Sequence, residues 1–230
     1  ARVTVDNETK YAILTDGQGS VTFSGLAVGT HTVVVSYNGD NNYVRGNSVN
    51  TTVKVSRGPA DIKVTADPVN YGEDVVVNVT LADATRRVNV TLGNESKLIS
   101  LVNGTASVKF SGLAVGSYDV AVSYNGDSNY IKSSASAVAK VIKAVPELQV
   151  SANDINVGED LVVDVQLPDD VSRRAIVTIG NESKLVILKA GIGTVKFTGL
   201  SVGTHEVVVS YAGDENYKSV TKTTTIEVKE

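Results

Sequence analysis

Apolar and polar residues alternate along many short segments of this chain. In residues 75–81, Val75, Val77, Val79 and Leu81 share one face while the residues between them point the other way. Residues 161–167 repeat the pattern. A period of two is typical of half-buried β-strands, whereas an amphipathic helix has a period near 3.6. The alternation therefore predicts an all-β protein.

The alternating segments recur with a fixed spacing. Phe23, Phe110 and Phe197 lie 87 residues apart, and Gly-Leu-x-Val-Gly occupies 25–29, 112–116 and 199–203 with the same spacing. Such self-similarity is the mark of repeated structural units. We name residues 1–57 the first repeat, 58–144 the second repeat and 145–230 the third repeat, and expect one domain in each.

Each complete repeat is predicted to form an immunoglobulin-like sandwich. Turn residues between the alternating segments of the second repeat place strands near 61–66, 74–81, 87–92, 97–102, 105–111, 117–124 and 133–142. Short strands at this spacing favour two packed antiparallel sheets. Gly58-Pro59 and Val145-Pro146 leave only short joints, which proline holds extended. The expected architecture is a series of tandem antiparallel β-sandwiches arranged as a rod.

The first repeat lacks the residues that would form its first two strands. Arg2 to Val5 align with residues 89–92, so roughly five strands with open edges and an uncovered sheet face are expected. Two interpretations stay open. The chain is an excerpt of a longer protein, or it is a subunit that accepts strands from a neighbouring chain and polymerises.

A second motif, Tyr-x-Gly-Asp-x-Asn-Tyr, joins the last two predicted strands of each repeat; we call it the tyrosine turn. Its glycine suits a left-handed turn position, and its aspartate suits hydrogen bonds to nearby backbone amides. The tyrosines are expected to pack across the loop. A calcium site at the joints and a sugar-stacking platform are the weaker alternatives. The recurring residues are Tyr37, Asp40, Tyr43, Tyr124, Asp127, Tyr130, Tyr211, Asp214 and Tyr217.

Together the two motifs resemble a known family. The run from Gly-Leu-x-Val-Gly to Tyr-Asn-Gly-Asp-x-Asn-Tyr, at 25–43 and 112–130, is similar to the group 3 bacterial Ig-like repeats of adhesin-like cell-surface proteins, as in methanogenic archaea. The third repeat departs by carrying Ala212. The resemblance implies a stalk built of many copies, and the family has no catalytic residues to place on this sequence.

The amino-acid composition excludes most kinds of catalytic and metal-binding site. With no Cys, disulfides, thiolate zinc sites and cysteine nucleophiles are excluded, and only two His are present. His31 and His205 share one position, which Tyr118 fills in the second repeat, so a ring packed at a corner is expected there. The net charge is −4 and the basic residues form no continuous stripe, which argues against nucleic-acid binding. We expect no enzyme activity, cofactor, metal or membrane span in this chain.

Two residue types suggest covalent modification. Lys109 and Lys196 recur as candidates for a self-made isopeptide bond, but alternation turns both outward, away from the desolvated setting that this bond requires. Asn-x-Ser/Thr sequons are in excess, and either turn chemistry or glycans on an exported protein would explain them. The candidate glycosylation sites are Asn7, Asn94, Asn181, Asn50, Asn78, Asn89 and Asn103.

These observations favour a non-enzymatic structural stalk of an extracellular, cell-surface, adhesin-like protein, with the repeats acting as spacer. Its partners would be neighbouring repeats of the same or an identical chain, and a glycan or protein ligand bound elsewhere in the full protein. One alternative is the self-assembling filament subunit. The other is a glycan- or protein-binding module that uses the loops between the last two strands.

Overall fold

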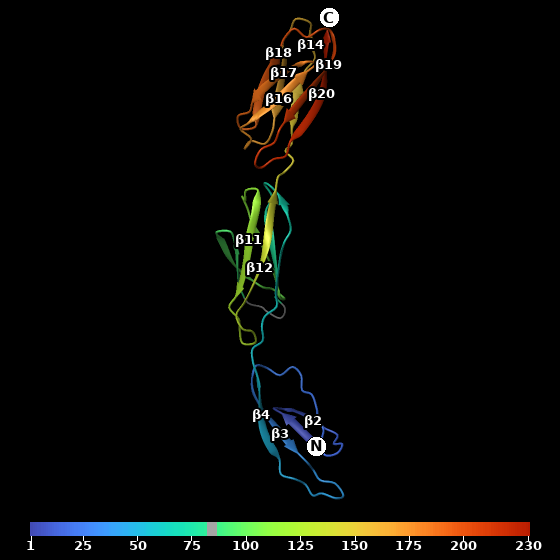
Figure 1. Cartoon of the computed structure of the whole chain (residues 1–230), viewed down its shortest axis with the longest axis vertical. Helices are drawn as coiled ribbons and strands as arrows, with labels where there is room; N and C mark the ends of the chain where they lie inside the picture. The colour runs from blue at the N-terminus through green and yellow to red at the C-terminus, as the bar shows by residue number, and fades with distance from the viewer. Residues whose placement is uncertain (82–86) are drawn as a thin grey trace. The chain divides into compact units, whose positions relative to one another are not determined.

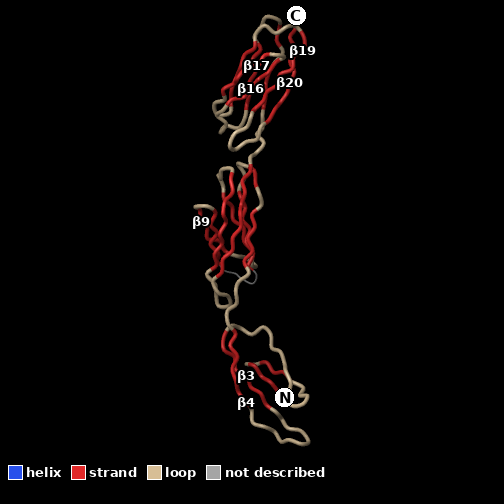
Figure 2. Tube along the Cα trace, in the orientation of Figure 1, coloured by secondary structure: helices blue, strands red, loops and turns tan. Residues whose placement is uncertain are grey.

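The computed structural model describes residues 1–81 and 87–230. Within these ranges the chain consists of strands and loops, without a helix (Figures 1 and 2). Backbone contacts group the chain into two compact units. The first holds residues 1–64, 78–107 and 121–136, and the second holds 65–77, 108–120 and 137–230. This division into two units does not follow the three repeats, so one domain in each repeat remains a prediction.

The first repeat forms a single antiparallel sheet with the strand order β2-β1-β3-β4. In its register Val3 lies opposite Val35, and His31 lies opposite Val53. The strands are β1 (Arg2–Val5), β2 (Glu8–Tyr11), β3 (Gly29–Ser36) and β4 (Val49–Val55).

The expectation of about five strands in the first repeat was wrong, because four form. Residues 18–23, which align with a strand in each later repeat, form a loop in the first. In the third repeat the aligned strand, Ile192–Phe197, is hydrogen-bonded to the strand Leu161–Gln166, which has no counterpart within residues 1–57. A strand needs a neighbour for its backbone N–H and C=O groups, so this segment stays irregular without one.

The second repeat forms two sheets, with the orders β10-β7-β5 and β6-β12-β11-β8-β9. All seven predicted strands of this repeat are found, each starting within two residues of its predicted start, and β6 is an additional two-residue strand parallel to β12. The strands are β5 (Ile62–Ala66), β6 (Val69–Asn70), β7 (Val75–Leu81), β8 (Arg87–Leu92), β9 (Glu95–Ser100), β10 (Thr105–Phe110), β11 (Gly116–Tyr124) and β12 (Ser133–Ile142).

The third repeat has the same arrangement, in sheets of order β13-β15-β18 and β14-β20-β19-β16-β17. Leu161 lies opposite Phe197 in the smaller sheet, and Val177 lies opposite Val209 in the larger. The strands are β13 (Gln149–Ala152), β14 (Ile155–Asn156), β15 (Leu161–Gln166), β16 (Arg174–Ile179), β17 (Glu182–Ile187), β18 (Ile192–Phe197), β19 (Gly203–Tyr211) and β20 (Val220–Lys229).

The core of the third repeat lies between its two sheets, as alternation predicts. Leu161, Val163 and Val165 of β15 are fully buried and pack in one cluster with residues of β16 and β19. Asp164 points outward and accepts a hydrogen bond from Thr194 (2.7 Å). The prediction of an all-β protein with tandem immunoglobulin-like sandwiches is confirmed.

Candidate functional site

The aspartate of each tyrosine turn binds the backbone of its own turn. In the first repeat, Asp40 Oδ1 accepts the N–H groups of Asn42 (2.7 Å) and Tyr43 (2.8 Å). Asp127 receives the same two bonds from Asn129 and Tyr130, and Asp214 receives them from Asn216 and Tyr217. The geometry is that of a side chain capping a turn.

The glycine of each tyrosine turn is required by its backbone. Gly39, Gly126 and Gly213 have φ values of 89°, 81° and 83°. A Cβ on any of them would come within 2.7–2.8 Å of the backbone oxygen of the second tyrosine. The preceding Asn38 and Asn125 do not have positive φ, so glycine alone adopts the left-handed conformation in these turns.

The first tyrosine of the turn donates to the same carboxylate. Tyr37 Oη donates to Asp40 Oδ2 (2.5 Å), and Tyr211 Oη donates to Asp214 Oδ2 (2.6 Å). The bond from Tyr37 lowers the pKa of Asp40 and raises that of Tyr37. Burial alone would raise the pKa of Asp214, but the bonds from Tyr211 and the backbone amides outweigh it and lower that pKa. Both carboxylates are therefore held ionised as acceptors.

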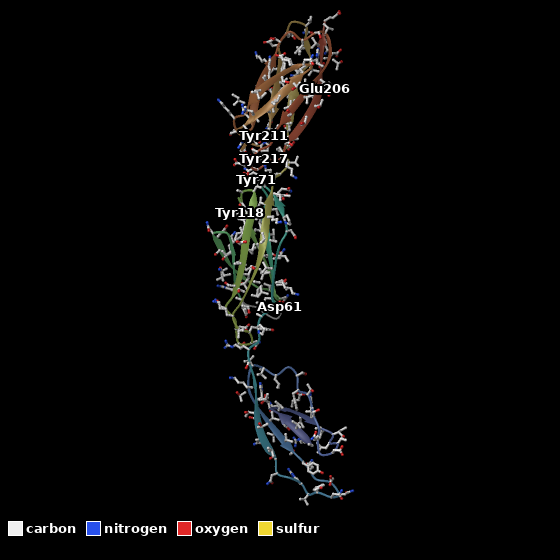
Figure 3. All side chains as sticks on the ribbon, viewed as in Figure 1. Asp61, Tyr71, Tyr118, Glu206, Tyr211 and Tyr217 are labelled. Atoms are coloured by element: carbon white, nitrogen blue, oxygen red, sulfur yellow. The ribbon has the colours of Figure 1, made fainter. Side chains whose placement is uncertain are left out.

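The second tyrosine of the third repeat lies in a cluster that sequence reasoning missed. Tyr71 and Tyr217 each donate a hydrogen bond to Asp170, at 2.9 Å to separate carboxylate oxygens. Their rings meet edge to face, with centroids 5.4 Å apart, and both tyrosines are labelled in Figure 3. The hydrogen bond to Asp170 raises the pKa of Tyr71. The pKa of Tyr217 is raised mainly by burial and, after that, by its own hydrogen bond to Asp170. We call these three residues the tyrosine–aspartate junction.

The junction links the second and third repeats inside the second compact unit. Tyr71 follows β6 in the second repeat, whereas Asp170 and Tyr217 belong to the third. Nearby, the Lys143 ammonium donates to the carbonyl oxygen of Asp214, and Arg173 forms an ion pair with Glu215 (3.3 Å). The junction was hidden from sequence reasoning because Tyr71 aligns with Val157 in the third repeat, so no recurrence marks it.

One hollow on the third repeat has no grouping of acids and bases. It measures about 550 Å³, and Arg174 is the charged residue among those that line it. Within residues 1–81 and 87–230, no group of three or more His, Asp or Glu side chains is placed to hold a metal ion. The hollow is lined by Arg174, Ile176, Leu185, Ser210, Tyr211, Ala212, Ser219 and Thr221.

The two histidines and Tyr118 perform one structural role. His31 Nε2 lies 2.7 Å from the carbonyl oxygen of Ala27, and His205 Nε2 lies 2.7 Å from that of Ser201. Tyr118 Oη donates to the same carbonyl position, in Ala114, at 2.8 Å. Each ring thus ties the start of its strand to the Gly-Leu-x-Val-Gly turn, as expected of a corner residue.

The candidate glycosylation sites fall into two groups. Asn7, Asn94 and Asn181 are exposed at the two-residue turns that join β1 to β2, β8 to β9 and β16 to β17. Asn103 also lies in a turn, with a φ of 50°. The others lie within strands: Asn50 in β4, Asn78 in β7 and Asn89 in β8. Asn78 is engaged by Ser107, which donates to its side-chain oxygen (2.7 Å).

The lysine that follows these turns has a role that sequence reasoning also missed. Lys10 Nζ donates to the carbonyl oxygen of Thr22 (2.7 Å) and lies 4.9 Å from the ring centre of Phe23. In the third repeat Lys184 Nζ donates to the carbonyl oxygen of Lys196 (2.7 Å) and lies 4.7 Å from the ring centre of Phe197. The recurring Asn-Glu-x-Lys motif could have predicted this role, because it places a lysine at the same position in each repeat.

The candidate isopeptide lysines point outward, as alternation predicts. Lys109 lies 3.5 Å from Asp74, and Lys196 lies 3.8 Å from Asp160. All four side chains are well exposed to solvent. A condensation between lysine and a carboxyl group needs both in their uncharged forms, which burial favours and these surface positions do not provide.

Comparison with known families finds one match, which lies in the second repeat. Residues 62–143 match the model of the bacterial Ig-like domain (group 3). The match runs from the start of β5 to just beyond β12, so it covers both sheets of the second repeat. No curated protein matches the chain.

Solved structures similar to the chain include tandem Ig and fibronectin(III)-like domains. Titin domains I67–I69 share 13% identity at a TM-score of 0.43, covering 100% of this chain and 87% of that one. Fibronectin(III)-like modules of Clostridium thermocellum CbhA share 18% identity at a TM-score of 0.32, covering 74% and 94%. Chicken CNTN1 FN1–FN3 domains share 12% identity at a TM-score of 0.30, covering 100% and 88%.

A search of the described residues for membrane-spanning helices finds none with the required length and apolar character.

Proposed function

We propose that this chain is a non-enzymatic spacer: a tandem Ig-like stalk segment of an extracellular, adhesin-like surface protein. Spacing requires domains that keep their own fold and joints that keep their geometry. It requires no reactive centre. The bacterial Ig-like family supports this class of role, because such domains are often found on cell surfaces.

The observation that carries the proposal is the internal use of the tyrosine turn. In the first and third repeats, both carboxylate oxygens of the turn aspartate accept hydrogen bonds from groups of the same turn. A loop that recognises a ligand instead directs polar groups outward. The turn is also almost the same in all three repeats, whereas binding loops would differ between copies. The motif therefore supports folding rather than recognition.

The tyrosine–aspartate junction supports the proposal from a second direction. Two phenol hydroxyls on one carboxylate, together with an edge-to-face ring pair, restrain the joint between the second and third repeats. A restrained joint keeps neighbouring domains of a stalk in a fixed relative orientation, whereas a flexible Gly/Ser linker would not.

Small-angle scattering on a lengthened chain tests the spacer role. A second copy of residues 58–144 is inserted after residue 144, and the maximum dimension is compared with that of the original chain. Strands of about seven residues at ~3.3 Å each, plus loops, predict an increase on the order of 40 Å. A spacer must lengthen with each repeat, so growth that matches a compact globule of the same mass contradicts the proposal.

Exposure on the cell tests the extracellular assignment separately. Intact cells of the producing organism are treated with a protease and probed with antibodies raised against the third repeat. The expected result is loss of the antibody signal without loss of a cytoplasmic marker. Protection of the protein until the cells are lysed contradicts surface exposure.

A further inference from the structure

The recurring turn sequons contain an asparagine that the turn itself does not use. Asn7, Asn94 and Asn181 are exposed, and within the described residues none of their side chains makes a hydrogen bond. None of the three has a positive φ, because the residue before each adopts the left-handed conformation, as in Gly93 and Gly180. Asparagine suits turns when it takes that conformation or hydrogen-bonds to nearby backbone. Here it does neither, so turn chemistry does not explain these three asparagines.

Three of the other candidate asparagines do have a structural role. Asn103 adopts the left-handed conformation itself, with a φ of 50°. Asn78 accepts a hydrogen bond from Ser107 (2.7 Å), and Asn89 Nδ2 donates to Thr91 Oγ1 (3.4 Å). These side chains are explained by the fold without a modification. The recurring turn asparagines differ from them, which favours the interpretation that the turns carry glycans.

The hydroxyl of each turn sequon is engaged in the folded chain. In every repeat, the Ser or Thr two residues after the asparagine shares a hydrogen bond with a threonine directly opposite in the same hairpin. An asparagine followed by this hydroxyl is the acceptor signal for N-glycosylation. The closed hairpin therefore withholds part of the signal. The pairs are Thr9 with Thr4 (3.0 Å), Ser96 with Thr91 (2.8 Å) and Ser183 with Thr178 (2.8 Å).

We propose that Asn7, Asn94 and Asn181 carry N-linked glycans that are added before their hairpins close. The side-chain amide nitrogen forms a bond to the anomeric carbon of an oligosaccharide, while the bond from that carbon to a lipid diphosphate carrier breaks. The lipid diphosphate leaves, and the amide loses one proton to a base of the oligosaccharyltransferase. After folding, an exposed turn accommodates the bulky glycan. This inference rests on the proposed extracellular role, because such transfer acts on exported chains.

Asn50 provides a reference acceptor that folding leaves open. Its sequon lies on β4, at the edge of its sheet, and within the described residues the hydroxyl of Thr52 has no hydrogen bond. The corresponding stretch of β20 also lacks a second neighbour, since β14 pairs only with Val228 and Lys229. Transfer to Asn50 should therefore occur in folded and unfolded chains alike.

Glycopeptide mass spectrometry of the whole chain from the producing organism tests occupancy. A glycan is expected on each of the three turn asparagines. Ser183→Ala should remove the glycan from Asn181, whereas Ser183→Thr should retain it. A bare turn asparagine in a chain that the protease experiment places at the cell surface overturns this inference alone. Bare asparagines in a chain held inside the cell overturn the proposed function as well.

Transfer in vitro tests the order of modification and folding. The whole chain, made without glycans, is incubated with a solubilised oligosaccharyltransferase and a lipid-linked oligosaccharide. Val177→Asp places a charge at a fully buried position and should unfold the third repeat, and Leu161→Asp does so from the other sheet. In both variants transfer to Asn181 is expected to rise at least about 10-fold over the native chain. Transfer to Asn50 should stay the same.

A matched variant and an independent measurement complete the test. Val162→Asp changes an outward, partly exposed residue of β15, so Asn181 should remain as poor an acceptor as in the native chain. Hydrogen exchange in β19 reports which chains have folded. Equal transfer to Asn181 in folded and unfolded chains overturns the proposed order, because the closed hairpin would then present the complete signal.

Discussion

His31 and Asp6 link the stability of the first repeat to pH. The Nδ1 atom of His31 lies 2.6 Å from Asp6 Oδ2, and its Nε2 lies 2.7 Å from the carbonyl oxygen of Ala27. Both neighbours are acceptors, so the ring satisfies both only when both nitrogens carry protons. The hydrogen bond to Asp6, followed by that to Ala27, raises the pKa of His31 above its usual 6.5.

The expected stability change has a definite sign. Because the folded pKa of His31 exceeds the unfolded value, the stabilising effect is fully present below about pH 6.5 and is lost as pH rises through the folded pKa. NMR titration should give a midpoint above 6.5 for His31 in the native chain, and Asp6→Asn should lower it. A midpoint at or below 6.5 in the native chain would contradict the ion-pair geometry.

Asp214 should stabilise the third repeat through three hydrogen bonds. Asp214→Ala removes the acceptor of two backbone N–H groups and leaves the buried Tyr211 hydroxyl without its partner. The expected loss is about 1–3 kcal/mol in the free energy of unfolding, measured with urea. Glu215→Ala is the control, since its exposed ion pair with Arg173 contributes about 0–1 kcal/mol. Equal losses in both variants would refute the capping role.

At the scale of elements, burial decides what a side chain contributes. Leu161 of β15 is fully buried, whereas Leu185 of β17 is 58% exposed on the outer face. Leu161→Ala should cost about 2–5 kcal/mol in the free energy of unfolding, because it removes core contacts and leaves a cavity. Leu185→Ala should change stability by less than about 0.5 kcal/mol. Denaturant titration of both variants checks the difference, and a similar cost in each would contradict the assigned faces.

The contrast between β18 and residues 18–23 shows the limit of local sequence. Val21 and Phe23 carry the same alternation as Val195 and Phe197, yet only the latter pair lies in a strand. Alternation describes which face a side chain takes once a strand exists. Whether the strand exists depends on a partner far away in the chain.

At the scale of the whole molecule, a substitution in the tyrosine–aspartate junction tests whether the contact between the second and third repeats forms in solution. Asp170→Asn removes the charge that accepts both phenol hydroxyls, so the pKa values of Tyr71 and Tyr217 should fall toward their usual value near 10. Site-resolved NMR of labelled tyrosine rings follows each titration. Asp169→Asn, one residue earlier, should leave both titrations unchanged. If Asp170→Asn also leaves them unchanged, the junction does not form in solution.

Much of this protein follows from the sequence alone. The period of two and the turn glycines predicted the strands and the sandwich of the second and third repeats, since each is a pattern within a few neighbouring residues. The 87-residue spacing predicted that the same unit recurs. The tyrosine turn was predicted for the same reason, because Asp214 reaches groups only two and three residues away.

Tertiary structure decided what depends on distant partners. Tyr71 and Asp170 lie 99 residues apart in the chain, and neither recurs in a way that marks the pair. The loss of a strand at 18–23 likewise follows from a missing neighbour rather than from the segment's own residues. Local pattern sets which side chains face inward, but only the assembled sheets determine which of them are covered, because pairing and burial are properties of two segments and not of one.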